Sequence, residues 1–163
     1  MPTKKTKKIN RPPDELLSMH APLTIWRMAE KEAARSPHYR FKTGCIIYYG
    51  MGNGNTRTYS TGTAHPHNGG RRRTYSIHAE MHAVSRLPPQ HGGAICLLVT
   101  LTKSGNYATN SRPCVTCASL LDKHTWGCIY AELCNDGSWA IRRTPTADLL
   151  SGYLQPTKMN HHA

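Results

Sequence analysis

One histidine, one glutamate and two cysteines stand at spacings that strongly constrain the fold. His78 and Glu80 flank an alanine, and Cys114 and Cys117 follow in a Pro-Cys-Val-Thr-Cys run that begins at residue 113. Histidine nitrogen and cysteine sulfur are common zinc ligands, and three protein ligands with a fourth position open to water are typical of hydrolytic zinc sites. The fold must therefore bring two distant segments together around one metal, with Glu80 beside it.

Two other kinds of zinc site fit this pattern less well. A closed structural site needs a fourth protein ligand and leaves Glu80 without a role. The candidates for that fourth ligand are His82, Cys96, Cys128 and Cys134. A zinc protease motif reads His-Glu-x-x-His, whereas position 79 is alanine and the glutamate stands at 80. The residues favour an open site with three protein ligands and one carboxylate that moves protons.

The two motifs together resemble those of the cytidine deaminase superfamily, which are zinc-dependent nucleobase deaminases. The resemblance extends over about residues 22 to 144 in the order of elements. It implies a catalytic Zn²⁺ held by His78, Cys114 and Cys117, and hydrolytic removal of an exocyclic amine with Glu80 transferring the protons. It also implies an α/β fold, a three-layer α/β/α domain with a five-stranded mixed sheet.

Hydrophobic periodicity predicts alternating helices and strands over the same region. Helices are expected at residues 22–36, 75–86, 113–123 and 146–154. Strands are expected at residues 43–49, 57–63, 94–101, 127–133 and 138–143, with that at 94–101 central in the sheet. Polar loops are expected at residues 64–73 and 103–112.

A short turn at Asn135-Asp136-Gly137 predicts that the last two strands form an antiparallel hairpin, because so few residues cannot join parallel strands. Deoxycytidylate and tRNA-adenosine deaminases, which the motifs otherwise resemble, have a helix at this point. The hairpin is similar to free-cytidine deaminases, organellar RNA-editing domains and several toxin deaminases. The resemblance therefore favours cytosine as the base, with adenosine in tRNA as the alternative.

The charge balance is strongly basic, with 21 lysines and arginines against 9 acidic residues and a formal net charge of +12. Such a surplus favours polyanionic partners. Five of the positive charges lie in residues 1–13, which we expect to be a disordered basic tail that either solubilises the protein or contacts nucleic acid. Residues 14–154 are then the deaminase domain and residues 155–163 a polar tail.

Six cysteines without a signal peptide or a long apolar run indicate a reducing compartment. We expect the cytoplasm, or the nucleus if the lysine-rich segment is a targeting signal, and no association with a membrane. Four cysteines lie in or beside apolar strands, where packing in the hydrophobic core is the expected role. They are Cys45, Cys96, Cys128 and Cys134. A homo-oligomer is possible on the family resemblance.

Several polar residues are candidate substrate contacts, namely His65, His67, Asn68, Arg71, Arg72, Arg73, His82 and Arg112. The arginine triplet either binds phosphate or forms an exposed basic loop. His82 replaces the asparagine of the related sequence H-A-E-M-N-A, and it either contacts substrate or is a solvated surface residue. The asparagine that the family presents from the end of its second strand is absent from residues 61–64.

Three aromatic residues, Tyr130, Trp126 and Trp139, either stack on bases or pack in the core, and the core is favoured. The expected substrate is a cytosine in single-stranded DNA or RNA, or a cytidine-type nucleotide. Two alternatives remain at this point, a tRNA adenosine deaminase and a non-catalytic nucleic-acid-binding module with a vestigial zinc site.

Overall fold

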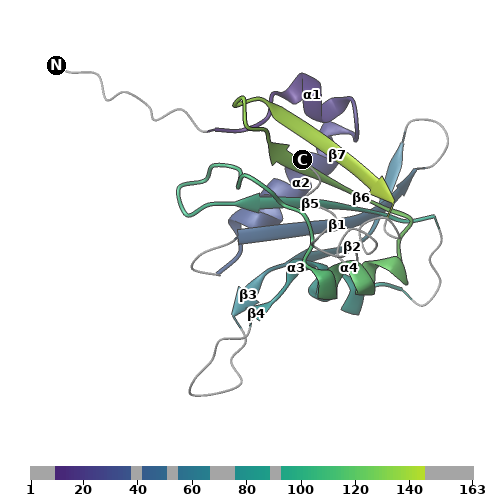
Figure 1. Ribbon diagram of the computed structural model, residues 1–163. Coiled ribbons are helices and arrows are strands. Elements are labelled where there is room, and N and C mark those ends of the chain that lie inside the picture. Colours follow the sequence, from purple (N-terminus) through teal and green to yellow (C-terminus); the bar gives the residue numbers. More distant parts are fainter. Residues whose placement is uncertain (1–9, 38–41, 51–54, 67–75, 89–92, 146–163) are drawn as a thin grey trace, which may run out of the picture.

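A five-stranded mixed sheet runs through the centre of the molecule (Figure 1). The computed structural model describes residues 10–37, 42–50, 55–66, 76–88 and 93–145. The strand order is β2-β1-β5-β6-β7. The strands are β1 (Lys42–Gly50), β2 (Thr56–Thr63), β5 (Ile95–Leu101), β6 (Gly127–Leu133) and β7 (Trp139–Pro145). Only β5 and β6 pair in parallel within this sheet, and β5 is its central strand, as predicted.

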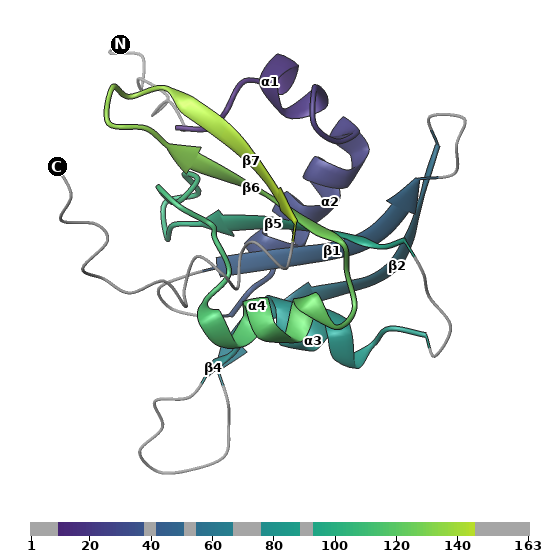
Figure 2. The ribbon, with the colours of Figure 1, turned by 45° about the vertical axis from the view of Figure 1, so that its right-hand side comes forward.

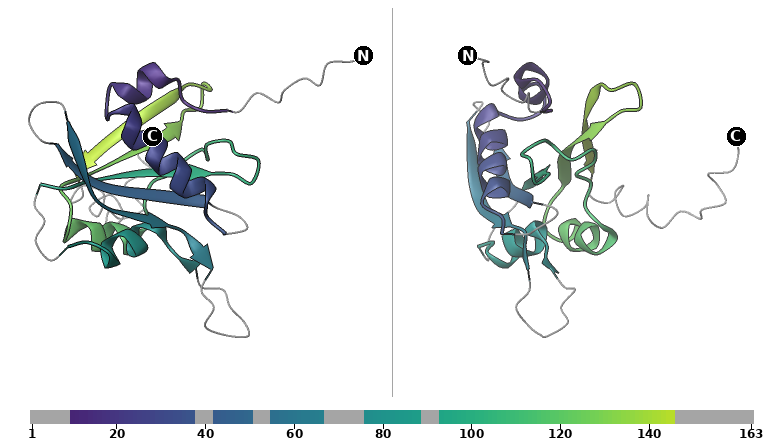
Figure 3. Two further views of the ribbon diagram at one scale, coloured as in Figure 1. Left: turned by 180° about the vertical axis from the view of Figure 1, so that it is seen from behind. Right: turned by 90° about the vertical axis from the view of Figure 1, so that its left-hand side faces the viewer.

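Helices cover both faces of the sheet, which confirms the three-layer α/β/α architecture (Figures 2 and 3). The helices are α1 (Asp14–Ser18) and α2 (Leu23–Ala34) on one face, and α3 (Ala79–Ser85) and α4 (Val115–Asp122) on the other. Alternate strand residues point to opposite faces. In β1, Ile46 therefore packs with α2, whereas Cys45 and Ile47 pack with α3 and α4.

The face that carries α2 is held by an apolar helix stripe and a buried hydrogen bond. Ile25, Trp26 and Ala29 recur at helical spacing and are buried. The indole Nε1 of Trp26 donates to the Leu17 carbonyl oxygen at 2.9 Å, so this large side chain is buried without an unsatisfied donor. Helix α1 was not expected, and Leu17 is the residue through which it joins this core.

The opposite face brings α3 unusually close to the edge strand β2. A Cβ atom added to Gly62 would collide with the Ala79 carbonyl oxygen and the Ala83 backbone nitrogen. Ala79 and Ala83 are themselves fully buried. Small residues on both elements therefore allow the backbone of α3 to lie against β2, and this contact fixes the position of the residue that precedes the helix, His78.

The last two strands form the antiparallel hairpin that the Asn-Asp-Gly turn predicts. Gly137 has a φ of 85°, a conformation that favours glycine. The Asp136 carboxylate accepts hydrogen bonds from the Ser138 backbone and hydroxyl at 3.0 and 2.6 Å. Residues Gly127 to Leu133 then pair with Pro145 to Trp139 in antiparallel register.

The third helix begins later than the sequence pattern predicts. Ser76–Ile77 form a short strand, β4, where a helix was expected. It pairs antiparallel with β3 (His65–Pro66), which lies in the segment expected to be loop. His78 has extended backbone angles, with a φ of −72° and a ψ of 149°, so α3 starts only at Ala79. The prediction of a helix from residue 75 was therefore wrong at its start, because pairing with a distant segment takes precedence over local periodicity.

The fourth helix begins two residues after Pro113. Cys114 is its N-cap, with an extended ψ of 167°, and Val115 is the first helical residue. Pro113 therefore precedes the helix and does not occupy its first turn. The predicted helix at residues 146–154 and the polar tail lie outside the described residues. Among those described, no helix is long and apolar enough to cross a membrane.

Residues 10–13, which the sequence pattern assigns to the basic tail, contact the domain. Pro12 is fully buried, and the Tyr107 backbone N–H donates to the Asn10 carbonyl oxygen at 2.9 Å. The Arg11 guanidinium binds the Glu30 carboxylate of α2 at 2.7 Å. This short segment therefore links α2 to the loop that follows β5.

Candidate active site

Three side chains that could hold a metal ion meet where α3 and α4 begin. His78 is the N-cap residue of α3, and Cys114 is the N-cap residue of α4. The Nδ1 atom of His78 lies 3.2 Å from the Cys117 Sγ and 3.5 Å from the Cys114 Sγ. The three ligand atoms all lie within 4.8 Å of one another. The structure thus brings together two segments that are 36 residues apart in the sequence.

The spacing of these atoms fits a zinc ion. Bonds of about 2.0 Å to nitrogen and 2.3 Å to sulfur place two such ligands roughly 3.6 Å apart around a tetrahedral ion. The two nitrogen-to-sulfur distances, 3.2 and 3.5 Å, are close to that value. Among the described residues this is the only cluster of three or more possible ligands, and none of these residues adds a fourth ligand to it.

Cys96 and Cys128 belong to the sheet and not to this cluster. Both are fully buried on neighbouring strands, and the Cys96 Sγ lies 3.4 Å from the Cys45 Sγ. Core packing, the expected role of these three cysteines, is confirmed. Cys134 is only partly buried, at the end of the hairpin, and also lies outside the cluster.

The pKa of the Cys117 thiol is raised by burial, whereas a position near a helix N-terminus would by itself lower it. Helix dipoles lower the pKa of thiols near a first turn. Here burial, followed by the nearby Glu80 carboxylate, raises the pKa of Cys117 in the metal-free protein. A cation bound between the three ligands would favour the thiolate, so binding of the metal should release a proton from this residue.

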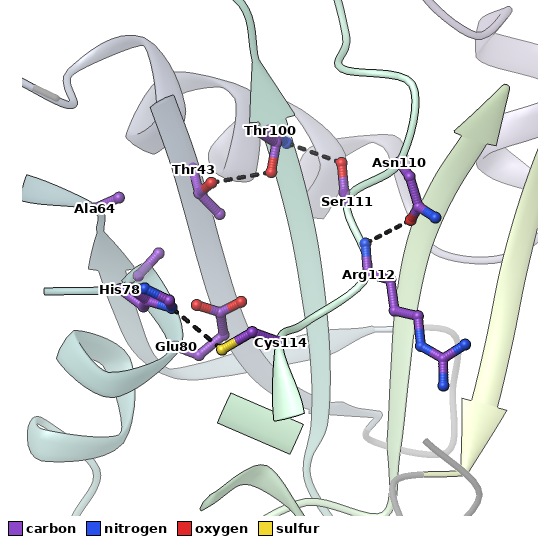
Figure 4. Close-up of a pocket in the computed structure, with 10 residues that line it drawn as sticks. Thr43, Ala64, His78, Glu80, Thr100, Asn110, Ser111, Arg112 and Cys114 are labelled. Atoms are coloured by element: carbon purple, nitrogen blue, oxygen red, sulfur yellow. Dashed lines mark hydrogen bonds between the residues drawn. The ribbon is translucent and has the colours of Figure 1, made fainter. Parts of the chain in front are cut away.

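Glu80 lies beside the ligand cluster and is only 5% exposed. Figure 4 shows its carboxylate between His78 and Cys114, on the side of the cavity. Burial raises the pKa of Glu80 to about 7, and a hydrogen bond with Cys117 opposes this shift. The carboxyl group is therefore well suited to accept and donate protons near neutral pH.

A cavity of about 240 Å³ opens in front of these residues. Its lining comprises Thr43, Ala64, His78, Ala79, Glu80, Thr100, Asn110, Ser111, Arg112 and Cys114. Thr43 and Thr100 share a hydrogen bond of 2.9 Å between their hydroxyl groups, and the Thr100 backbone N–H donates to the Ser111 hydroxyl at 3.2 Å. The wall opposite the ligand cluster is thus polar and internally hydrogen-bonded (Figure 4).

Sequence reasoning did not identify Thr43 or Thr100 as lining residues. A usable signal exists, because threonines stand at the start of β1 and near the end of β5, in strands that are otherwise mostly apolar. In sheets with parallel strands, ligand sites gather at the carboxyl ends of those strands. Thr100 stands at such an end, and β1 begins directly beside it.

The predicted substrate contacts separate into four groups. Arg112 lines the cavity, with an exposed side chain that points away from His78 along β6 (Figure 4). His82 is not among the lining residues; its Nδ1 accepts a hydrogen bond from the Thr63 backbone N–H at 3.0 Å. His65 belongs to β3, and its side chain is outside the description. The others, His67, Asn68, Arg71, Arg72 and Arg73, lie outside the described residues.

The three aromatic residues have different environments. Tyr130 is buried, and Trp139 packs against the α2-side core with an edge-on ring contact to Tyr107 at 6.0 Å between centroids. Trp126 is 77% exposed, so the expectation that it packs in the core was wrong. Trp126 immediately precedes β6 and lies at the end of the parallel pair opposite the cavity.

Comparisons with known proteins agree with the fold. The sequence matches no family model and no curated protein. A cytidine deaminase from Burkholderia pseudomallei has a TM-score of 0.51 at 16% identity, covering 78% of this chain and 94% of that one. A cytidine deaminase from Mycobacterium tuberculosis has a TM-score of 0.47 at 19% identity, covering 80% and 94%. The likeness to the Burkholderia pseudomallei protein shows that this chain has a cytidine deaminase fold, built around a His/Cys/Cys cluster with a buried glutamate.

Proposed function

We propose that this protein is a zinc-dependent hydrolase that deaminates a nucleobase, converting cytosine to uracil in single-stranded DNA or RNA or in a cytidine-type nucleotide. One observation carries the proposal. His78, Cys114 and Cys117 converge at the wall of a cavity, and the buried Glu80 carboxyl lies beside them without being one of the three ligands. This arrangement has the parts that hydrolysis of an amine from a ring carbon requires.

Proton transfer is the part of the reaction that the chain itself performs. Zinc, when held by the three ligands, supplies Lewis acidity that lowers the pKa of water toward neutrality. Glu80 would accept the proton that this water loses and deliver it to N3 of the cytosine ring. It would then take the proton of the hydroxyl group added at C4 and pass it to the amine as the C4–N bond breaks and ammonia leaves. The place of Glu80 in the cavity wall, buried and close to the three ligands, supports this role.

The antiparallel β6–β7 hairpin supports cytosine as the base, because it departs from the arrangement expected of tRNA adenosine deaminases. Adenosine in tRNA remains the second candidate substrate, on the basis of the shared motifs. A binding module with a vestigial zinc site is the non-enzymatic rival. The intact Glu80 and its place in the cavity favour the enzyme, since such a module has no need of a buried carboxyl there.

A substrate panel tests this proposal. Zinc-loaded protein is incubated with cytidine, deoxycytidine, their monophosphates, single-stranded DNA and RNA, and a tRNA anticodon stem, and ammonia release is measured beside the Glu80→Gln variant. We expect release from at least one cytosine substrate and a loss of about 10²- to 10⁴-fold in the variant. Equal behaviour of the two proteins on every substrate would show that the site is not catalytic.

A further inference from the structure

A second groove lies beside the catalytic cavity, at the outer edge of β2. It has a volume of about 360 Å³ and is lined by Glu32, Arg35, Pro37, Thr61, Thr63, His82 and Arg86. Thr63 lines the groove, and the next residue along the chain, Ala64, lines the cavity. His82 likewise follows His78 by one helical turn, about 5–6 Å along the axis. A molecule that extends beyond the cavity can therefore reach the groove.

Two arginines border this groove, one from each face of the sheet. Arg35 is the C-cap residue of α2, and Arg86 is the C-cap residue of α3. The Arg35 side chain is 68% exposed, and its contact with Glu32 is long, at 3.4 Å. Arg86 donates one Nη1 hydrogen bond to the Thr61 carbonyl oxygen at 3.2 Å. Guanidinium groups have five N–H donors, so these contacts use only part of their capacity.

The one acidic side chain in the groove is engaged by its neighbours. Glu32 is 17% exposed and accepts a hydrogen bond from the Thr63 hydroxyl at 2.6 Å, in addition to its contact with Arg35. Two guanidinium groups against one such carboxylate leave a positive balance at the mouth of the groove. This balance favours an anion.

His82 lines the groove and is tied to the edge strand. Its Nδ1 accepts the Thr63 backbone N–H at 3.0 Å. This hydrogen bond satisfies a backbone N–H of the edge strand β2 and limits rotation of the His82 ring.

We propose that this groove binds the phosphate of a nucleotide that flanks the target base in a single-stranded nucleic acid. The inference rests on the proposed deaminase function and assigns the strand a path from the cavity across the end of β2. Arg35 and Arg86 bind the phosphate oxygens, for which guanidinium groups are geometrically suited. The groove thereby favours a polynucleotide over a free nucleoside.

A simpler role for the two arginines makes a different prediction. Cations near helix C-termini stabilise helices through the macrodipole, whatever the substrate. If that were their only role, neutral substitutions of the two arginines would lower the melting temperature. The affinity for nucleic acid would then fall no more than it does when any other positive charge is removed. Affinity and stability must therefore be measured separately on the same variants.

The test compares the binding of a labelled single-stranded oligonucleotide with one cytosine to zinc-loaded full-length protein over a range of salt concentrations. The variants are Arg35→Gln alone and Arg35→Gln with Arg86→Gln, since Arg86 also holds the edge strand. Arg57→Gln is the matched control, because Arg57 is exposed on the same strand, six residues or roughly 20 Å from Thr63. Inorganic phosphate is added in a separate arm as a competitor.

The double variant should bind the oligonucleotide about tenfold more weakly, equivalent to about 1.4 kcal/mol, than the control variant does. The slope of log affinity against log salt concentration should become less steep by about 0.7, as expected for one lost phosphate contact. Arg35→Gln should show part of both effects. Equal affinities of the double variant and Arg57→Gln, or absence of oligonucleotide binding by the wild type, would each overturn the inference. Inorganic phosphate should compete with the oligonucleotide for the groove, and competition that is equally strong in the double variant would also overturn it.

These outcomes are independent of turnover. A protein that binds the oligonucleotide through the groove but deaminates nothing would contradict the proposed function and leave the groove assignment standing. A protein that deaminates cytosine with unchanged affinity in the double variant would do the reverse.

Discussion

Replacement of Glu80 should abolish deamination, whereas replacement of a ligand residue should abolish zinc binding as well. Replacement of Cys117 by serine removes a soft ligand, so zinc content after dialysis should fall well below one ion per chain. Glu80→Gln should keep its zinc and lose deamination, because the carboxyl is close to the ligands without being one of them. Metal analysis of both variants separates the two roles.

Cys134→Ser is the control for the metal measurement. Cys134 is partly buried and lies outside the ligand cluster, so its loss should leave zinc content unchanged. A comparable loss of zinc from Cys134→Ser and Cys117→Ser, or a loss of zinc from Glu80→Gln, would contradict the assignment of ligands.

At the scale of elements, the approach of α3 to β2 determines where His78 lies. Gly62→Ala places a methyl group against the Ala79 carbonyl oxygen and the Ala83 nitrogen, both of which are backbone atoms that cannot rotate away. We expect a loss of about 1–3 kcal/mol in the free energy of unfolding, measured by denaturant titration. Gly50→Ala is the control, since a Cβ there meets no atom of the described part of the chain within 4 Å. Similar stabilities of the two variants would show that the contact is not tight.

Local sequence pattern was sufficient to predict the elements whose conformation depends on their own residues. The strand at Gly127–Leu133 agrees with the prediction residue by residue, because its apolar run is bounded by a clear turn on one side. The Cys114 and Cys117 spacing likewise predicts neighbours at a helix start. The motif pair with its glutamate thus predicted the ligand cluster that the structure shows.

Contacts between distant segments were not predictable from local pattern. The start of α3 depends on pairing of Ser76–Ile77 with His65–Pro66, and a short pairing of this kind leaves no periodic trace in either segment. The bond between His82 and the Thr63 backbone depends on how the helix lies across the strand. The Thr43 and Thr100 hydroxyls meet only because β1 and β5 are neighbours in the sheet.

For the molecule as a whole, the N-terminal segment should divide into two functional parts. Removal of residues 1–9 deletes four lysines, so the affinity for an oligonucleotide should depend less steeply on salt concentration, while the melting temperature stays the same. Removal of residues 1–13 also deletes the buried Pro12 and the Arg11–Glu30 ion pair, and the melting temperature should fall. Thermal unfolding and binding measured on both truncations check this division, and equal melting temperatures would contradict it.

The central claim is that zinc at the His78, Cys114 and Cys117 cluster makes this protein a cytosine deaminase. The most direct measurement follows conversion of cytosine to uracil by mass spectrometry, in the purified protein, after removal of metal by a chelator, and after return of one equivalent of zinc. We predict conversion that disappears with the metal and returns with zinc in the wild type but not in Glu80→Gln. Conversion that persists without metal, or none on any cytosine substrate in the zinc-loaded protein, would contradict the account.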